Sequence, residues 1–83
     1  MQKKISVMKI HKKTSIPREH HSAKNVSCDV LIWNGEYYTM AYHNYLTKEW
    51  YHSHTLEPIE EDFVWIYPPI NKMKEVFNMT KER

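Results

Sequence analysis

Two β-rich segments joined by Asn34-Gly35 are the feature of this sequence that most constrains its fold. Residues 29–33 and residues 36–42 are rich in β-branched and aromatic side chains. Asn followed by Gly readily takes the two positive-φ positions of a type I′ turn, and the twist of that turn matches the flanking strands. The sequence therefore predicts an antiparallel β-hairpin that turns at residues 34–35.

The first of these segments is apolar at every position from Val30 to Trp33, so both of its faces are apolar. Such a strand is normally central in its sheet or covered by another element. Residues 11–27 have no periodicity and contain Pro17, which predicts a long loop. Further strands are predicted from alternation and β-propensity, at residues 4–10, 47–52 and 63–67.

A short helix is predicted after Pro68-Pro69, because proline cannot donate to a strand ladder and ends the last strand. Ile70, Met73, Val76 and Phe77 recur at helical spacing. A helix over about residues 71–79 is therefore expected, with one apolar stripe packed on the sheet. The expected fold class is α+β, a mainly antiparallel sheet of four or five strands with one short C-terminal helix.

The 83 residues are expected to form one small domain. It comprises a basic N-terminal strand and long loop (1–28), a β-meander core (29–69) and a C-terminal helix and tail (70–83). The three tryptophans are expected to cluster through cross-strand contacts. The predicted core consists of apolar residues from every element: Ile5, Val7, Val30, Ile32, Trp33, Met40, Trp50, Trp65, Ile66 and Phe77.

Charge divides the chain into a basic N-terminal arm (residues 1–28) and an acidic body (residues 29–83). The arm carries seven lysines and arginines against one glutamate, whereas the body carries five against nine acidic residues. This asymmetry is typical of nucleic-acid contact, and equally of an arm that packs on its own body. The single cysteine and the lack of any apolar run of signal-peptide or membrane-spanning length lead us to expect a cytoplasmic protein.

The order of motifs resembles a family of small domains of unknown function found in phages and bacterial prophages. The motifs are Ile16-Pro17, residues 29–32, a Tyr/Ala/Tyr strand, Trp50 and the ending over residues 65–69. Members of that family read Leu-Pro, then Val-Leu-Val, then a lone Trp and a final Thr-His-Trp-Met-Pro. Val64 stands where the family has His, so no role for that His is carried over. The resemblance implies no activity.

Three groups of residues are candidates for chemistry. His52 and His54 on one strand face could bind zinc together with His20, His21 or Cys28, although no pair has the usual ligand spacing. Cys28 could be a nucleophile, but the neighbouring Asp29 disfavours its thiolate. The acidic residues 57–62 are more typical of a solvated loop than of a general acid and base. We therefore predict no catalytic residue, no metal site and no cofactor, and a protein that is not an enzyme.

Binding functions remain, and protein binding is favoured over nucleic-acid binding. An edge strand could accept a partner strand and an aromatic face could anchor one, so a protein partner or a homodimer is expected, with no membrane contact. The alternative is single-stranded nucleic acid, held by phosphate contacts from the arm and base stacking on tyrosines. The residues of that alternative are Lys3, Lys4, Lys9, Lys12, Lys13, Arg18, Tyr38 and Tyr42.

Overall fold

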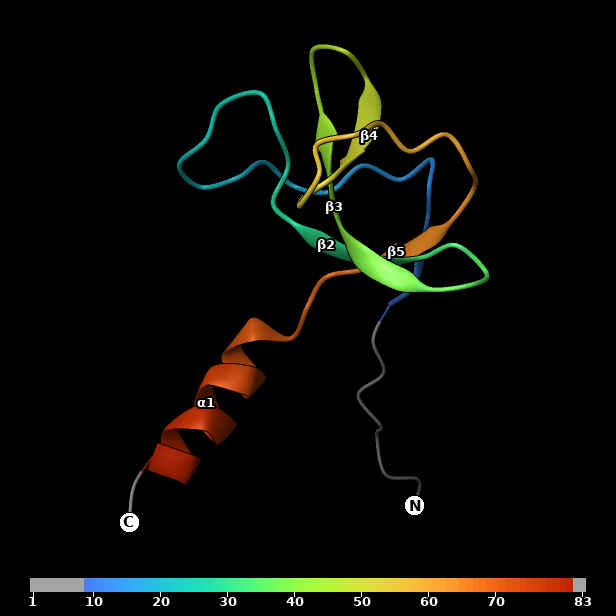
Figure 1. The fold of residues 1–83 in the computed structure, drawn as a ribbon. Helices are drawn as coiled ribbons and strands as arrows, with labels where there is room; N and C mark the ends of the chain where they lie inside the picture. The colour runs from blue at the N-terminus through green and yellow to red at the C-terminus, as the bar shows by residue number, and fades with distance from the viewer. Residues whose placement is uncertain (1–8, 82–83) are drawn as a thin grey trace, which may run out of the picture.

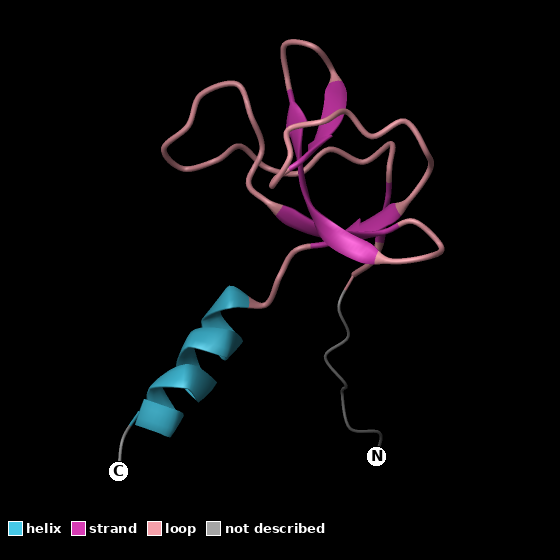
Figure 2. Ribbon diagram, in the orientation of Figure 1, coloured by secondary structure: helices cyan, strands magenta, loops and turns pink. Residues whose placement is uncertain are grey.

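The structure is a computed structural model that describes residues 9–81 as one five-stranded antiparallel sheet and one C-terminal helix (Figure 1, Figure 2). The predicted fold class is thereby confirmed. The predicted strand at residues 4–10, with the core candidates Ile5 and Val7, lies almost wholly outside the described residues. The elements are β1 (His11–Lys12), β2 (Val30–Trp33), β3 (Tyr38–Asn44), β4 (Glu49–His52), β5 (Val64–Ile66) and α1 (Ile70–Lys81).

The predicted hairpin forms, but its turn differs from the expected type. Trp33 pairs with Tyr38, and the Asn34 N–H donates to the Tyr37 carbonyl, so Gly35 and Glu36 are the central residues. Within this turn, only Gly35 has a positive φ, 103°. The Asn34 side chain instead accepts hydrogen bonds from the N–H groups of Glu36 and Tyr37. The type I′ prediction, with Asn34 at positive φ, is therefore wrong.

The strand order is β1-β5-β2-β3-β4. Strands β2, β3 and β4 form a meander, but β5 returns to the free edge of β2 instead of following β4, so the meander predicted for residues 29–69 ends at β4. The predicted central position of β2 is confirmed. The two edge strands are β1 and β4.

The core lies on one face of the sheet, here called the inner face. The loop between β4 and β5 closes over it, because the Ile59 N–H donates to the Trp50 carbonyl and Phe63 packs edge-to-face on Trp50 at 4.9 Å. Trp65 is only 1% exposed and stacks on His11 at 4.2 Å, and its indole N–H donates to the carbonyls of Lys12 and Ser15. The buried hydrophobic residues are Val30, Ile32, Ala41, Trp50, Ile59, Phe63 and Trp65.

Several core predictions need correction. Trp50 and Trp65 are core residues whose rings lie 6.0 Å apart, but Trp33 is 46% exposed and lies away from them beside Tyr38. Alternation explains this difference, since Trp33 points to the face opposite Ile32. Met40 and Ile66 are only half-buried, because they lie on that same opposite face.

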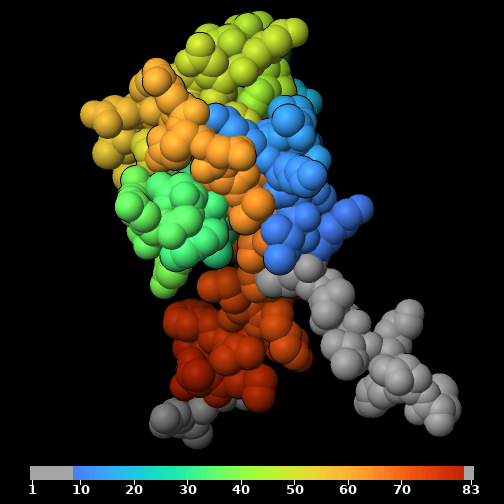
Figure 3. All heavy atoms as spheres, turned by 90° about the vertical axis from the view of Figure 1, so that its right-hand side faces the viewer, coloured from blue at the N-terminus to red at the C-terminus, as the bar shows by residue number. Residues whose placement is uncertain are grey.

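The segment predicted as a loop over residues 11–27 is ordered against the body. It contributes β1, and the Ser27 N–H donates to the His43 carbonyl while the Ser27 hydroxyl oxygen accepts a hydrogen bond from the His43 N–H. Lys13 Nζ donates to the carbonyl of Glu61 at 2.9 Å and of Glu60 at 3.2 Å. The charge asymmetry had two interpretations, nucleic-acid contact and an arm that packs on its own body. The described part of the arm fits the second. Figure 3 shows this contact, with the blue arm beside the orange β4–β5 loop.

Helix α1 does not cover the sheet, contrary to the prediction. It spans Ile70–Lys81, close to the expected residues 71–79, but none of its residues is buried and it contacts none of the strands among residues 9–81. Phe77, predicted for the core, is 62% exposed. Figure 3 shows α1 as a separate lobe below the sheet, joined to it through the short segment after β5.

His43 is a buried titratable group within the core. It is 6% exposed, its ring lies 5.3 Å from that of Trp50, and its Nδ1 has no hydrogen-bond partner among the described residues. Burial lowers the pKa of His43 below its usual value, and a hydrogen bond with the Lys48 backbone only partly opposes this shift.

The buried position of Trp65 predicts a large loss of stability on Trp65→Phe. The change removes two hydrogen bonds and part of a packed ring, so the free energy of unfolding should fall by about 2–4 kcal/mol. Trp33→Phe is the matched control and should change it by less than about 0.5 kcal/mol, since Trp33 is half exposed. Urea denaturation monitored by circular dichroism measures both, and equal losses in the two variants would refute this description of the core.

The buried His43 predicts that stability falls in mild acid. Above about pH 6.5 the ring is neutral in both folded and unfolded chains. Because the folded pKa is lower, the unfolded chain binds a proton first as the pH falls, and the free energy of unfolding decreases until the folded pKa is passed, by at most about 1.4 kcal/mol per pH unit. His43→Phe keeps an aromatic ring and should flatten this decrease in urea titrations between about pH 7 and 5. An unchanged pH profile in the variant would show that His43 does not cause it.

Candidate functional site

The face of the sheet opposite the core, here called the outer face, carries two rows of apolar side chains across three strands. Strand register places Ile66, Leu31 and Met40 directly opposite one another on β5, β2 and β3. Two residues further along each strand, a second row is formed by Val64, Trp33 and Tyr38. We call these six residues the outer patch. Alternation along each strand produces it, because the residues between them point into the core.

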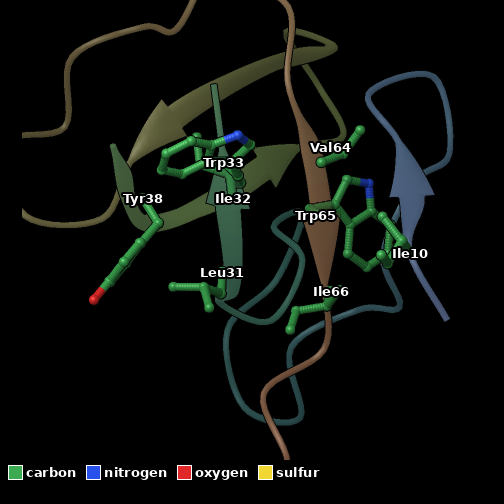
Figure 4. Close-up of a pocket in the computed structure, with 8 residues that line it drawn as sticks. All are labelled: Ile10, Leu31, Ile32, Trp33, Tyr38, Val64, Trp65 and Ile66. Atoms are coloured by element: carbon green, nitrogen blue, oxygen red, sulfur yellow. The ribbon is translucent and has the colours of Figure 1, made fainter. Parts of the chain in front are cut away.

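The outer patch is open to solvent and hollowed. Tyr38 is 69% exposed, and Val64 and Trp33 also count as exposed. Their side chains, with that of Ile10 just before β1, line a groove of about 290 Å³. Figure 4 shows Leu31, Trp33 and Ile66 around this groove, while the Tyr38 hydroxyl points away from it. The groove walls are therefore hydrocarbon, and they suit an apolar occupant.

An aromatic pair continues the outer face beyond the patch. Tyr42 of β3 and Tyr51 of β4 are register partners whose rings stack at 5.7 Å, and both are half-buried. Within the patch itself, the rings of Trp33 and Tyr38 lie 6.4 Å apart. The outer face thus carries apolar or aromatic side chains on every strand from β5 to β4, which is unusual for a surface left in water.

Acidic groups border the hairpin end of the outer patch. Glu36 lies in the hairpin turn, and Glu61 is held beside that turn because the Asn34 side-chain amide donates to its carboxylate at 3.3 Å. Hydrogen bonds from its own backbone N–H and from Asn34 lower the pKa of the Glu61 carboxyl. Glu61 is therefore a carboxylate at neutral pH, and the Lys13 ammonium, which donates to the Glu61 carbonyl at 2.9 Å, lies close to it.

Of the residues predicted for nucleic-acid binding that lie within residues 9–81, three are engaged in contacts inside the fold. Lys13 Nζ is engaged by the carbonyls of the β4–β5 loop, and the Arg18 guanidinium lies over the Tyr67 ring at 4.3 Å. Lys12 lies opposite Val64 on the outer face, on the same side of the sheet as Tyr38. Tyr42 is packed against Tyr51 rather than free to stack on a base. Lys9 is exposed, and Lys3 and Lys4 lie outside the described residues.

The candidate metal ligands are dispersed. Among residues 9–81, no group of three His, Cys, Asp or Glu side chains is placed to hold a metal ion. His52 ends β4, whereas His54 lies in the turn after it, so they do not share a strand face as expected. The His20 ring stacks on that of His21, and its Nδ1 accepts hydrogen bonds from the N–H groups of Ser22 and Ala23.

Cys28 is a half-buried residue that packs against the core. Burial raises the pKa of its thiol, which outweighs the opposing effect of the Arg18 charge. The thiol is therefore protonated at neutral pH, and this environment does not activate it as a nucleophile.

Sequence reasoning missed the outer patch although its signal was present. The apolar second face of β2, Leu31 and Trp33, indicated only a strand that is central in its sheet or covered by another element. The same spacing of two residues between apolar or aromatic side chains recurs on β3, at Tyr38 and Met40, and on β5, at Val64 and Ile66. Together these residues form one continuous face. Whether anything covers such a face cannot be read from alternation alone.

No helix among residues 9–81 has the length and hydropathy needed to cross a membrane. Comparison of the chain with protein-family models, with curated proteins and with solved structures finds no match.

Proposed function

We propose that this protein is a non-enzymatic interaction domain that binds a protein partner through the outer patch. The single observation that carries the proposal is the pair of apolar rows on an open sheet face, with Trp33 and Tyr38 exposed at its edge. Aromatic anchors in an apolar groove are the usual centre of a protein interface. The order of motifs, which resembles that of small phage and prophage domains, is the basis for proposing a mobile-element origin.

The chemistry of the groove favours an apolar protein segment over nucleic acid. Leu31, Val64 and Ile66 offer aliphatic contacts, whereas single strands are held by aromatic stacking and phosphate contacts. Carboxylates at the hairpin end of the patch would repel phosphates. Two of the candidate phosphate ligands, Lys13 and Arg18, are engaged within the fold.

Nucleic-acid binding is retained as the second candidate because of one observation. Trp33 and Tyr38 are neighbouring exposed aromatic residues, and Lys12 lies on the same face of the sheet. This arrangement resembles a small stacking platform with one cationic neighbour. Nucleic-acid binding at this platform should weaken steeply as the salt concentration rises. Binding of an apolar peptide in the groove should not.

An amphipathic peptide is the probe that tests the proposal. A displayed library of amphipathic helical peptides, selected on the full chain immobilised at low density, should yield binders with one apolar face. Trp33→Lys puts a charge into the groove and should weaken these binders by at least about tenfold. Leu46→Lys is the matched control, because Leu46 is exposed in the β3–β4 turn and lies outside the patch.

Two results would contradict protein binding at this face. One is a selection whose binders tolerate Trp33→Lys as well as Leu46→Lys. The other is tight binding of a fluorescent oligothymidylate that is lost in Trp33→Lys and falls steeply between about 50 and 200 mM salt. The second result would establish the nucleic-acid alternative in its place.

A further inference from the structure

Helix α1 carries an unpartnered apolar surface of its own. Ile70, Met73, Val76 and Phe77, here called the helix stripe, lie within one third of the helix circumference and are all exposed. Lys72, Lys74 and Lys81 flank the stripe, while Glu75 is the one acidic residue of the helix. A short amphipathic helix is marginal alone in water and depends on burial of its apolar face. The chain therefore presents two apolar surfaces, one on the sheet and one on the helix.

The segment between β5 and α1 holds these two surfaces apart. Tyr67 is anchored to the body, since its hydroxyl accepts a hydrogen bond from the Arg18 N–H and its ring packs edge-to-face on Trp65 at 5.0 Å. Tyr67 and Pro68 each precede a proline, which disfavours helical backbone at both positions. The chain therefore favours an extended backbone as it leaves the sheet, and a hydrogen bond from the Ile70 N–H to the Pro68 carbonyl at 2.8 Å closes a tight turn at Pro69 just before the helix. The views in Figure 1 and Figure 3 agree that α1 points away from the body.

The two surfaces match each other in size and charge. From Ile70 to Phe77 the helix stripe is about 10 Å long. The outer patch spans β5, β2 and β3, which is about 10 Å across two strand spacings. Lys74 and Lys81 beside the stripe are opposite in charge to Glu36, which lies in the hairpin turn at one end of the patch, whereas Lys72 is paired with Glu75 of the same helix at 3.7 Å. A stiff extended connection with complementary surfaces on either side of it is the arrangement that favours exchange between two copies.

We propose that the outer patch of each chain binds helix α1 of a second copy, so that two chains form a symmetric helix-exchanged dimer. This inference rests on the proposed function, because it names the partner of the same patch. In a single chain with the observed connection, the outer patch and the helix stripe both stay exposed to water. Exchange between two chains covers both patches and both stripes at once.

Analytical ultracentrifugation of the full chain is the first test, and a species of twice the 10.1-kDa chain mass is expected. Phe77→Lys should shift the chain to monomer, with self-association weakened by at least about tenfold. Asn78→Lys, next to it but off the stripe, is the matched control and should remain dimeric. None of these helix residues is buried, so the variants should keep the circular dichroism and cooperative unfolding of the sheet. Trp33→Lys should also be monomeric.

Mixing the two monomeric variants tests exchange itself. Trp33→Lys retains an intact helix stripe and Phe77→Lys retains an intact patch, so one of the two contacts reforms in a mixed pair. The heterodimer should therefore form at least about tenfold more tightly than either variant self-associates. A double change, Pro68→Gly with Pro69→Gly, removes the extended bias and should increase the monomer fraction, because α1 can then reach its own sheet.

The inference is overturned if the wild-type chain is monomeric at concentrations of tens of micromolar, if the dimer survives Phe77→Lys, or if the two variants fail to associate on mixing. Its failure is distinguishable from failure of the proposed function. A monomeric chain that still selects peptides sensitive to Trp33→Lys retains the patch as a protein-binding surface and excludes only the second copy as its partner.

Discussion

The pairing of β2 with β3 on one edge and with β5 on the other is the constraint on which the rest of the structure depends. This register places Ile32 between Thr39 and Trp65, so Val30, Ile32 and Trp65 share the covered face. The same register necessarily places Leu31 between Met40 and Ile66 on the opposite face. The core and the outer patch are thus two consequences of one alignment. A slip by one residue would exchange them.

Local patterns were sufficient to predict β2 to β5 and α1, but not β1, which lies in a segment predicted as a loop. The Asn34-Gly35 hairpin, the strands around Trp50 and Trp65 and the helix after Pro68-Pro69 all follow from short-range alternation, turn chemistry and helical spacing. The turn type was missed because Asn34 uses its side chain to cap the turn rather than its backbone to make it. An asparagine at a turn can either adopt a positive φ or keep a negative φ and accept backbone hydrogen bonds with its side chain. The sequence alone does not decide between these two conformations.

Which face of the sheet is covered could not be predicted, because the covering segments have no periodicity. Ile59 and Phe63 come from the β4–β5 loop, and Lys13 ties that loop to the arm through carbonyl groups that no side-chain pattern reveals. Trp33 and Trp65 have similar strand neighbours, so only the long-range pairing distinguishes a core tryptophan from an exposed one. The position of α1 likewise depends on the extended backbone of Tyr67 and Pro68, not on the amphipathicity that correctly predicted the helix.

An open apolar patch, an unpartnered helix stripe and a connection that keeps them apart lead to one central claim, which is that helix α1 of a second copy occupies the patch of each chain. The most direct measurement is an isotope-filtered nuclear Overhauser experiment on a one-to-one mixture of labelled and unlabelled full chains. The account predicts cross-peaks between the Leu31 and Ile66 methyl groups of one chain and the Phe77 ring of the other. Cross-peaks from these methyl groups only to water and to protons of their own chain would contradict it.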